Sequence, residues 1–255
     1  MQFPVYVHFG SVSILLHTIA EFAGIFIGFR YFLFLRKIQG DSVDSSNRLW
    51  IIIGAIFGAL LGSRILGALE KPHELFSTEN KLIYIYSNKT VVGGLLGGLW
   101  GVELIKKMIH EKKRSGDLFV FPLILAMIIG RVGCFSMGVF EETYGLQSRI
   151  PWAMDLGDGI RRHPVCLYEI FFLFISWISL YRIKKSYALD EGALFKLFMI
   201  SYLLFRFLLD FIKPGERYLF GMGTIQLVCL AGLLYYYRYL FKPRFLLKPQ
   251  VVLNN

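Results

Sequence analysis

Residues 49–69 read LWIIIGAIFGALLGSRILGAL, an apolar run with one charged side chain, that of Arg64. About 20 mostly apolar residues are enough to cross a bilayer as an α-helix. Six further stretches of this kind lie near residues 11–35, 91–109, 118–138, 164–182, 193–213 and 219–241. The sequence therefore predicts an all-α, polytopic membrane protein with seven transmembrane helices.

The composition supports a membrane protein. Of the 255 residues, 55% are hydrophobic and 18% are charged, whereas soluble proteins carry about 45–50% apolar and about 25% charged residues. The net charge of +10 would suit a nucleic-acid-binding protein. However, Lys and Arg cluster between the apolar runs, where they act as topology signals and as contacts to lipid headgroups. We therefore expect the lipid bilayer, and no nucleic acid, as a partner.

The Lys and Arg residues of the loops predict the orientation. On one side of the membrane, 15 of them flank the predicted helices, against 8 on the other side. Because short loops rich in Lys and Arg stay in the cytoplasm, the N-terminus should lie outside and the C-terminus inside. Residues 1–241 would form the membrane domain and residues 242–255 a basic cytoplasmic tail.

Six of the predicted helices carry polar side chains in their outer halves. These side chains are His17, Glu21, Arg64, Arg131, His163, Tyr168, Glu169, Arg206, Asp210 and Gln226. An ionisable group inside a membrane segment costs about 2.5–3.5 kcal/mol, so it needs a partner or a purpose. Their common depth predicts a hydrated cavity in the outer leaflet. Arginines there suit an anionic phosphate, and imidazoles and carboxylates could move protons.

Several of these groups also have a purely structural interpretation. Arg206 and Asp210 could form an ion pair across one helical turn. His17 and Glu21 could form a hydrogen bond that stabilises their helix, and Arg64 could extend to the membrane surface.

Glycines and cysteines complete the pattern. The Gly54/Gly58/Gly62 and Gly93/Gly97/Gly101 stripes predict close helix packing, and the backbone at Gly93 and Gly94 could alternatively bind a phosphate. Gly130 and Gly133 leave room for a ligand beside Arg131. Three cysteines, Cys134, Cys166 and Cys229, lack the spacing of a metal site. We expect no metal and no cofactor.

Five motifs occur in order along the chain: GALLGSRI around Arg64, VVGGLLGG at 91–98, GRVGCFSMG with EETYG at 130–145, RHPVCLYE at 162–169, and RFLLDF at 206–211 followed by GMGTIQ at 221–226. Together they resemble the phosphatidylglycerol–prolipoprotein diacylglyceryl transferase family. The resemblance implies seven helices in a bacterial cytoplasmic (inner) membrane, with an active site facing the outer leaflet. It also implies transfer of a diacylglyceryl group from phosphatidylglycerol to the lipobox cysteine thiol of a prolipoprotein, with release of glycerol 1-phosphate.

The chain departs from the family pattern at several positions. Cys134 and Met137 stand where the family has Asn, and Val92 stands where it has His. His17 occupies the place of a functional tyrosine, and Val139–Glu141 form an insertion before the Glu142-x-x-Gly145 end of the motif.

From the resemblance and these altered positions together, we assign expected roles to individual residues, with His17 as a replacement for the histidine that the family has at the position of Val92. Arg131 and Arg206 would bind the phosphate, His17 or Glu142 would transfer the proton, and Asp210 would orient Arg206. The residues expected to bind substrate are Arg64, Gly93, Gly94, Gly133, Cys134, Gly145, His163 and Tyr168.

Two other functions remain open on the sequence. A paralogue could use the same lipid donor on another acceptor, which the altered positions favour. A non-catalytic lipid-binding or transport protein could keep the phosphate site and lack the base. Intramembrane proteolysis is not favoured, because the chain has no G-x-S-x-G nucleophile and no paired intramembrane aspartates.

Overall fold

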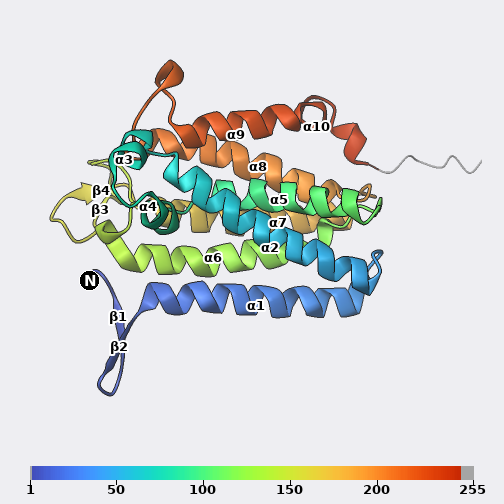
Figure 1. The fold of residues 1–255 in the computed structure, drawn as a ribbon, viewed down its shortest axis with the longest axis horizontal. Helices are drawn as coiled ribbons and strands as arrows, with labels where there is room; N and C mark the ends of the chain where they lie inside the picture. Colours follow the sequence, from blue (N-terminus) through green and yellow to red (C-terminus); the bar gives the residue numbers. More distant parts are fainter. Residues whose placement is uncertain (1, 248–255) are drawn as a thin grey trace, which may run out of the picture.

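The computed structural model describes residues 2–247, and these residues are mostly helical (Figure 1). Four helical segments are long and apolar enough to cross a membrane: α1 (Leu16–Gln39), α2 (Ser45–Ala68), Asp117–Phe140, which contains α6 (Val120–Met137), and α7 (Val165–Ser186). Much of their apolar surface faces outward; Phe22 is 71% exposed and Phe171 68% exposed. An apolar exterior of this kind is compatible with lipid and not with water.

Three shorter helices lie alongside these four in Figure 1: α5 (Val91–Met108), α8 (Ala193–Leu209) and α9 (Thr224–Tyr235). Short helices make the connections, namely α3 (Pro72–Ser77) and α4 (Lys81–Ser87) between α2 and α5, and α10 (Tyr237–Phe241) after α9. All seven stretches predicted from hydropathy thus contain a helix.

The largest difference from the sequence prediction lies at the N-terminus. Strand β1 (Tyr6–Phe9) pairs antiparallel with β2 (Val12–Leu15) through a turn at Gly10, whose φ is +61°. Helix α1 therefore begins at Leu16, and the prediction of a helix from residue 11 was wrong for this segment. A second two-stranded pair, β3 (Met154–Asp155) and β4 (Arg161–Arg162), lies in the loop between α6 and α7.

Helices α2 and α5 pack at the glycine stripes that the sequence predicts. A Cβ added at Gly58 would lie 2.2 Å from the Gly97 carbonyl oxygen, and one added at Gly101 would lie 2.1 Å from that of Gly54. Such separations leave no room for any side chain. The two backbones are therefore in direct contact, as in other small-residue helix pairs of membranes.

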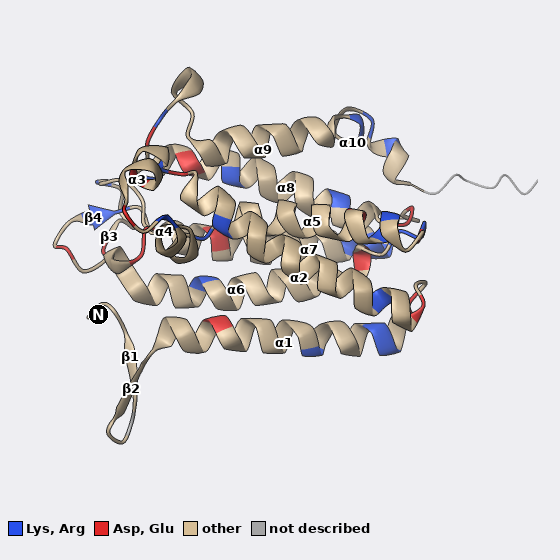
Figure 2. Cartoon of the chain, viewed as in Figure 1, with Lys and Arg blue, Asp and Glu red and all other residues tan. Residues whose placement is uncertain are grey.

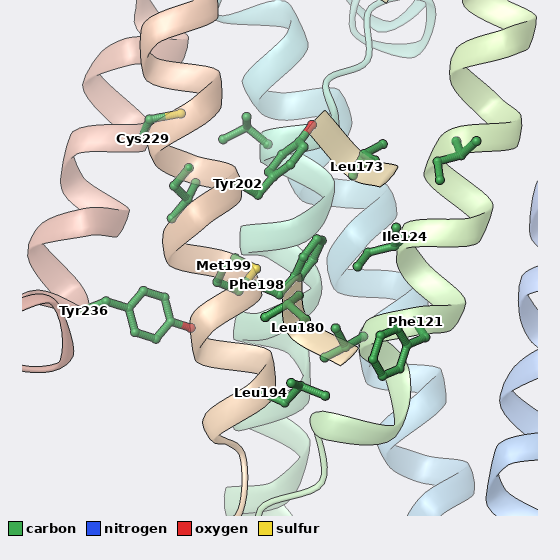
Figure 3. Close-up of a cluster of buried hydrophobic side chains, with 14 of the residues drawn as sticks. Phe121, Ile124, Leu173, Leu180, Leu194, Phe198, Met199, Tyr202, Cys229 and Tyr236 are labelled. Atoms are coloured by element: carbon green, nitrogen blue, oxygen red, sulfur yellow. The ribbon is translucent and has the colours of Figure 1, made fainter. Parts of the chain in front are cut away.

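A buried apolar cluster forms the centre of the bundle (Figure 3). Leu173 of α7 and Phe198 and Met199 of α8 are fully buried there, together with Ile124 of α6. Tyr202 of α8 lies at one end of the cluster, with its hydroxyl directed at a carboxylate of α7. The cluster thus fixes the mutual positions of α6, α7 and α8.

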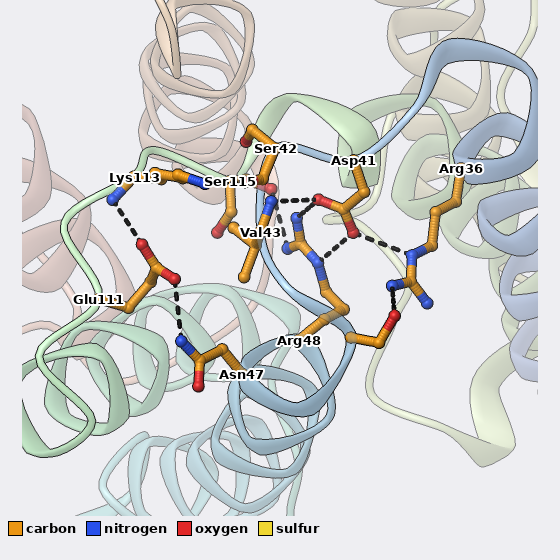
Figure 4. Close-up of polar contacts among 10 residues, drawn as sticks. Arg36, Asp41, Ser42, Val43, Asn47, Arg48, Glu111, Lys113 and Ser115 are labelled. Atoms are coloured by element: carbon orange, nitrogen blue, oxygen red, sulfur yellow. Dashed lines mark hydrogen bonds and ion pairs between the residues drawn. The ribbon is translucent and has the colours of Figure 1, made fainter.

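A polar network closes the end of the bundle where α1 joins α2 (Figures 2 and 4). Asp41 accepts hydrogen bonds from Arg36 Nε at 2.9 Å and from Arg48 Nε at 2.7 Å. Glu111, after α5, accepts one from Asn47 Nδ2 at 3.1 Å. Of the predicted basic tail 242–255, residues 248–255 lie outside the described residues.

Candidate functional site

A cavity of about 610 Å³ opens at the end of the bundle opposite this network. Its lining comes from seven helices, α1, α2, α4, α5, α6, α7 and α8, and from the segments that follow α2, α4, α6 and α8. The lining side chains with charged or reactive groups are His17, Glu21, Glu70, Lys89, Arg131, Cys134, Glu141, Glu142, Cys166, Glu169, Arg206 and Lys213. Of the ten polar side chains that the sequence places at one depth, five line this cavity, namely His17, Glu21, Arg131, Glu169 and Arg206, whereas Arg64, His163, Tyr168, Asp210 and Gln226 are not part of its lining.

A buried carboxylate joins the two arginines of the cavity. Glu169 of α7 is 1% exposed, and one of its oxygens lies 2.8 Å from Arg131 Nε of α6. Its other oxygen lies 3.6 Å from an Arg206 guanidinium nitrogen of α8. The Tyr202 hydroxyl donates to the first oxygen, the one paired with Arg131, at 2.7 Å. Two guanidinium groups thus share one carboxylate, so these three buried side chains carry one positive charge more than negative charges.

Further groups surround Arg206. Asp210, one turn later, lies 3.9 Å from it and 3.7 Å from Arg217. Asp210 is therefore a more distant partner of Arg206 than Glu169 is. The Arg206 Nε atom is buried without a hydrogen-bond partner among residues 2–247, so this donor is available to a bound anion.

His17 of α1 stands between two carboxylates. Its Nε2 lies 3.7 Å from Glu21, which accepts a 2.7 Å hydrogen bond from Lys89. Its Nδ1 lies 3.4 Å from Glu141 Oε2, and both of these atoms are buried without a hydrogen-bond partner in the described part of the chain. The Cys134 thiol completes a group in which one ligand atom each of His17, Cys134 and Glu141 lie within 4.8 Å of one another.

Glu142 occupies a different place from Glu141. Its carboxylate is 63% exposed and accepts a 2.6 Å hydrogen bond from Lys71, which raises the pKa of Lys71. The adjacent Glu70 is partly buried, and burial raises the pKa of its carboxyl. These groups form the rim of the cavity, so Glu141, rather than Glu142, faces His17.

Three of the predicted substrate-binding side chains lie outside the cavity lining. The Arg64 guanidinium lies 4.7 Å from the centre of the Tyr86 ring and donates to the Tyr86 carbonyl. His163 Nδ1 lies 3.1 Å from the Tyr168 hydroxyl, which also accepts from Trp152 Nε1 at 2.8 Å. These three side chains have local partners in the structure.

The predicted glycines serve mainly as points of close approach. A Cβ at Gly93 would lie 2.3 Å from the Gly62 carbonyl oxygen, and one at Gly133 would meet α1 beside His17. A Cβ at Gly145 would lie 2.5 Å from that of His163, whereas Gly94 meets its nearest neighbour only at 3.7 Å. Gly133 in particular allows α6 to approach the turn of α1 that carries His17.

Sequence reasoning missed the role of two residues. Glu169 was recognisable as a carboxylate in an apolar segment, but only the structure shows that it pairs with both arginines. Glu141 lies in the insertion relative to the family motif, and no pattern distinguishes it from Glu142 next to it. Likewise, no spacing reveals the group of His17, Cys134 and Glu141, because α1, α6 and the following loop each contribute one member.

Comparison with known proteins agrees with the motifs. The family model described as "Prolipoprotein diacylglyceryl transferase" matches residues 4–241. A phosphatidylglycerol–prolipoprotein diacylglyceryl transferase of Bordetella bronchiseptica is 32% identical over 180 residues, which is 66% of each chain. The corresponding protein of Methylobacillus flagellatus is 30% identical over 85% of each chain. That of Finegoldia magna is 24% identical over 87% of this chain and 88% of its own.

Proposed function

The chain belongs to the prolipoprotein diacylglyceryl transferase family, and we propose that it transfers a diacylglyceryl group from phosphatidylglycerol to the lipobox cysteine thiol of a prolipoprotein, releasing glycerol 1-phosphate. The observation that carries this proposal is the buried cluster of Arg131, Glu169 and Arg206 in the cavity. An excess guanidinium charge with a free donor suits the phosphate of an anionic lipid.

Different residues would act on the lipid donor and on the acceptor thiol. Arg131 and Arg206 would bind the phosphate and stabilise the negative charge that develops on it as the ester C–O bond breaks. The acceptor thiol would lie near His17, because an unperturbed thiol with a pKa of about 8.5 must lose its proton to become a good nucleophile. The thiol sulfur then bonds to the glyceryl carbon, and glycerol 1-phosphate leaves with the electron pair of the broken bond.

We further propose that α1, α2, α5, α6, α7, α8 and α9 each cross the membrane. The chain would then begin outside and end in the cytoplasm, as the distribution of Lys and Arg predicts. In this orientation the cavity faces the outer leaflet of a bacterial inner membrane, where phosphatidylglycerol and the lipobox segment would meet. Residues 1–241 would form the membrane domain and 242–255 its cytoplasmic tail.

Transfer is tested with the purified protein in phosphatidylglycerol bilayers that contain a lipobox cysteine peptide. We expect release of glycerol 1-phosphate together with a mass gain of one diacylglyceryl group on the peptide. His17→Ala should abolish both signals, and Arg206→Lys should weaken them. Arg114→Gln, which changes exposed contacts with Asp190 and the Glu191 carbonyl far from the cavity, is the control. An active His17→Ala variant would exclude His17 from the reaction.

The same assay separates two alternatives. Release of glycerol 1-phosphate without peptide modification would indicate another acceptor, an alternative that the altered positions His17 and Cys134 favour. Absence of both signals, while a relative is active in the same bilayers, would indicate a lipid-binding protein without catalysis.

A further inference from the structure

The cavity contains a nitrogen, a sulfur and an oxygen donor that converge on one point. One ligand atom each of His17, Cys134 and Glu141 lie within 4.8 Å of one another. Helix α1 supplies the imidazole, the last turns of α6 supply the thiol, and the loop after α6 supplies the carboxylate. The three residues lie at the positions where the chain departs from the family motifs described above.

Two of these three donors lack a hydrogen bond. His17 Nδ1 and Glu141 Oε2 are buried and have no hydrogen-bond partner within residues 2–247. A buried acceptor without a partner costs about 1–3 kcal/mol, and burying a charged one costs more. One metal ion that accepts an electron pair from each would satisfy both of these atoms, which lie 3.4 Å apart.

We propose that His17 Nδ1, Cys134 Sγ and a Glu141 carboxylate oxygen bind one Zn²⁺ ion. Bond lengths of about 2.0–2.2 Å to nitrogen and oxygen and about 2.3 Å to sulfur place tetrahedral ligands about 3.3–3.7 Å apart. The separation of 3.4 Å between His17 Nδ1 and Glu141 Oε2 falls in this range, and the thiol needs to approach by at most roughly 1 Å. A mixed N, S, O donor set selects zinc over the hard cations Mg²⁺ and Ca²⁺.

The surroundings also suit a zinc site. Glu21 lies 3.7 Å from the other ring nitrogen of His17 and is held by Lys89. A carboxylate in this place fixes the orientation of a zinc-bound imidazole and makes it a better ligand. Three protein ligands leave the fourth position of the metal open, which is the arrangement of catalytic rather than structural zinc sites. Here that position faces the cavity.

The role of this zinc ion in transfer rests on the proposed function. The acceptor thiol would occupy the fourth position, where its S–H bond breaks, a Zn–S bond forms and the proton passes to water at the cavity mouth. The bound thiolate would then attack the glyceryl carbon, and the electron pair of the broken C–O bond would leave with glycerol 1-phosphate. The site itself does not depend on this role, because metal binding requires neither lipid nor peptide.

The first test is metal binding by the full chain in lipid nanodiscs, purified without a polyhistidine tag, stripped with a chelator and then given Zn²⁺ or Co²⁺ alone. We expect about one bound ion per chain and, with Co²⁺, a thiolate-to-metal charge-transfer band. Cys134→Ser should remove that band, and His17→Gln and Glu141→Gln should each weaken Zn²⁺ binding by roughly 100-fold or more. Glu21→Gln should weaken it by about 10–100-fold.

Two controls are matched in residue type. Cys229→Ser changes a buried thiol of α9, and Glu142→Gln changes the neighbouring carboxylate at the rim; both should bind Zn²⁺ as the unmodified chain does. The site is overturned if the folded chain binds no metal, or if Cys134→Ser binds it equally well. The role in transfer is overturned if the metal-free chain transfers at the same rate. A chain that binds zinc and transfers nothing would overturn the proposed function and support the site.

Discussion

Replacing Glu169 by Gln removes one negative charge from the bottom of the cavity and changes little else in size. In the native chain this 1% exposed carboxylate lies 2.8 Å from Arg131 and 3.6 Å from Arg206. The variant would hold two buried guanidinium groups with no charge between them. Removal of one partner from a buried ion pair costs about 3–5 kcal/mol, because the remaining charge stays desolvated. We expect Glu169→Gln to lower the free energy of unfolding by about this amount.

The hydrogen bonds support the same magnitude. Glu169 accepts from the Tyr202 hydroxyl at 2.7 Å and pairs with Arg131 Nε at 2.8 Å. Both bonds go to the same oxygen, so the Gln carbonyl can keep them. As bonds to a neutral acceptor they contribute about 0.5–1.5 kcal/mol each, instead of about 1.5–3 kcal/mol for bonds to a charged group. This weakening, together with charge repulsion between the arginines, again gives a cost of a few kcal/mol. Transfer activity should fall with stability, because the arginines would no longer be held beside each other.

The assay is denaturant unfolding in mixed micelles, with the free energy extrapolated to zero denaturant. Asp190→Asn is the matched control, because Asp190 pairs with Arg114 at an exposed position and should change stability by at most about 1 kcal/mol. The double variant Glu169→Gln/Arg206→Gln leaves one buried guanidinium group, that of Arg131, instead of two that repel each other, so it should be more stable than Glu169→Gln alone. If Glu169→Gln lies within about 1 kcal/mol of the unmodified chain, the carboxylate is not what holds the two arginines.

Three further predictions concern packing, pH and ligand binding. Gly58→Ala places a Cβ 2.2 Å from the Gly97 carbonyl oxygen and should lower the free energy of unfolding in micelles by about 1–2 kcal/mol. The reason is that a packing penalty of about 1–3 kcal/mol exceeds a helix-propensity gain of about 1 kcal/mol. In the control Gly98→Ala, the added Cβ meets nothing closer than 3.4 Å, so this variant should be neutral or stabilising. Burial raises the pKa of Glu70 above its usual value of 4.5, so the folded chain binds this proton more tightly than the unfolded chain does. The free energy of unfolding should therefore fall as the pH rises above 4.5. Unfolding curves of Glu70→Gln, measured over the same pH range, should show a smaller fall than those of the unmodified chain. In the metal-free chain, Arg131→Met should abolish binding of phosphatidylglycerol in the cavity, measured as loss of the protection that this lipid gives Cys134 against thiol reagents.

The sequence predicts the helices well because the bilayer imposes one requirement on every spanning segment: about 20 apolar residues with all backbone groups bonded internally. It fails at Val12–Leu15, where apolar and β-branched residues continue the hydropathy of α1 into a strand. Hydropathy cannot distinguish the two, since both segments consist mostly of apolar residues. The strand becomes recognisable only from its pairing with Tyr6–Phe9 across Gly10.

The candidate site was predictable to the extent that charge in an apolar segment is costly. Arg131 and Arg206 stand out for this reason. The choice between Glu141 and Glu142 was not predictable, because it depends on backbone conformation. Glu141 has the extended torsion angles φ −128° and ψ 137°, and successive side chains of an extended chain point to opposite sides. One carboxylate therefore faces His17 and the next faces Lys71 at the rim.

Helix α6 connects the two halves of the proposed chemistry. Arg131 and Cys134 are three residues apart and lie on the same face of this helix, with a guanidinium nitrogen 3.6 Å from the thiol sulfur. In the proposed reaction the leaving phosphate would bind at the first residue and the acceptor sulfur beside the second, so one rigid helix would set the distance between them. Holding both reactants in this way can contribute about 7–11 kcal/mol to lowering a barrier. Gly133, between them, lets α1 approach closely enough for His17 to reach the same point, which makes the α1–α6 contact as necessary to the proposed reaction as the arginines themselves.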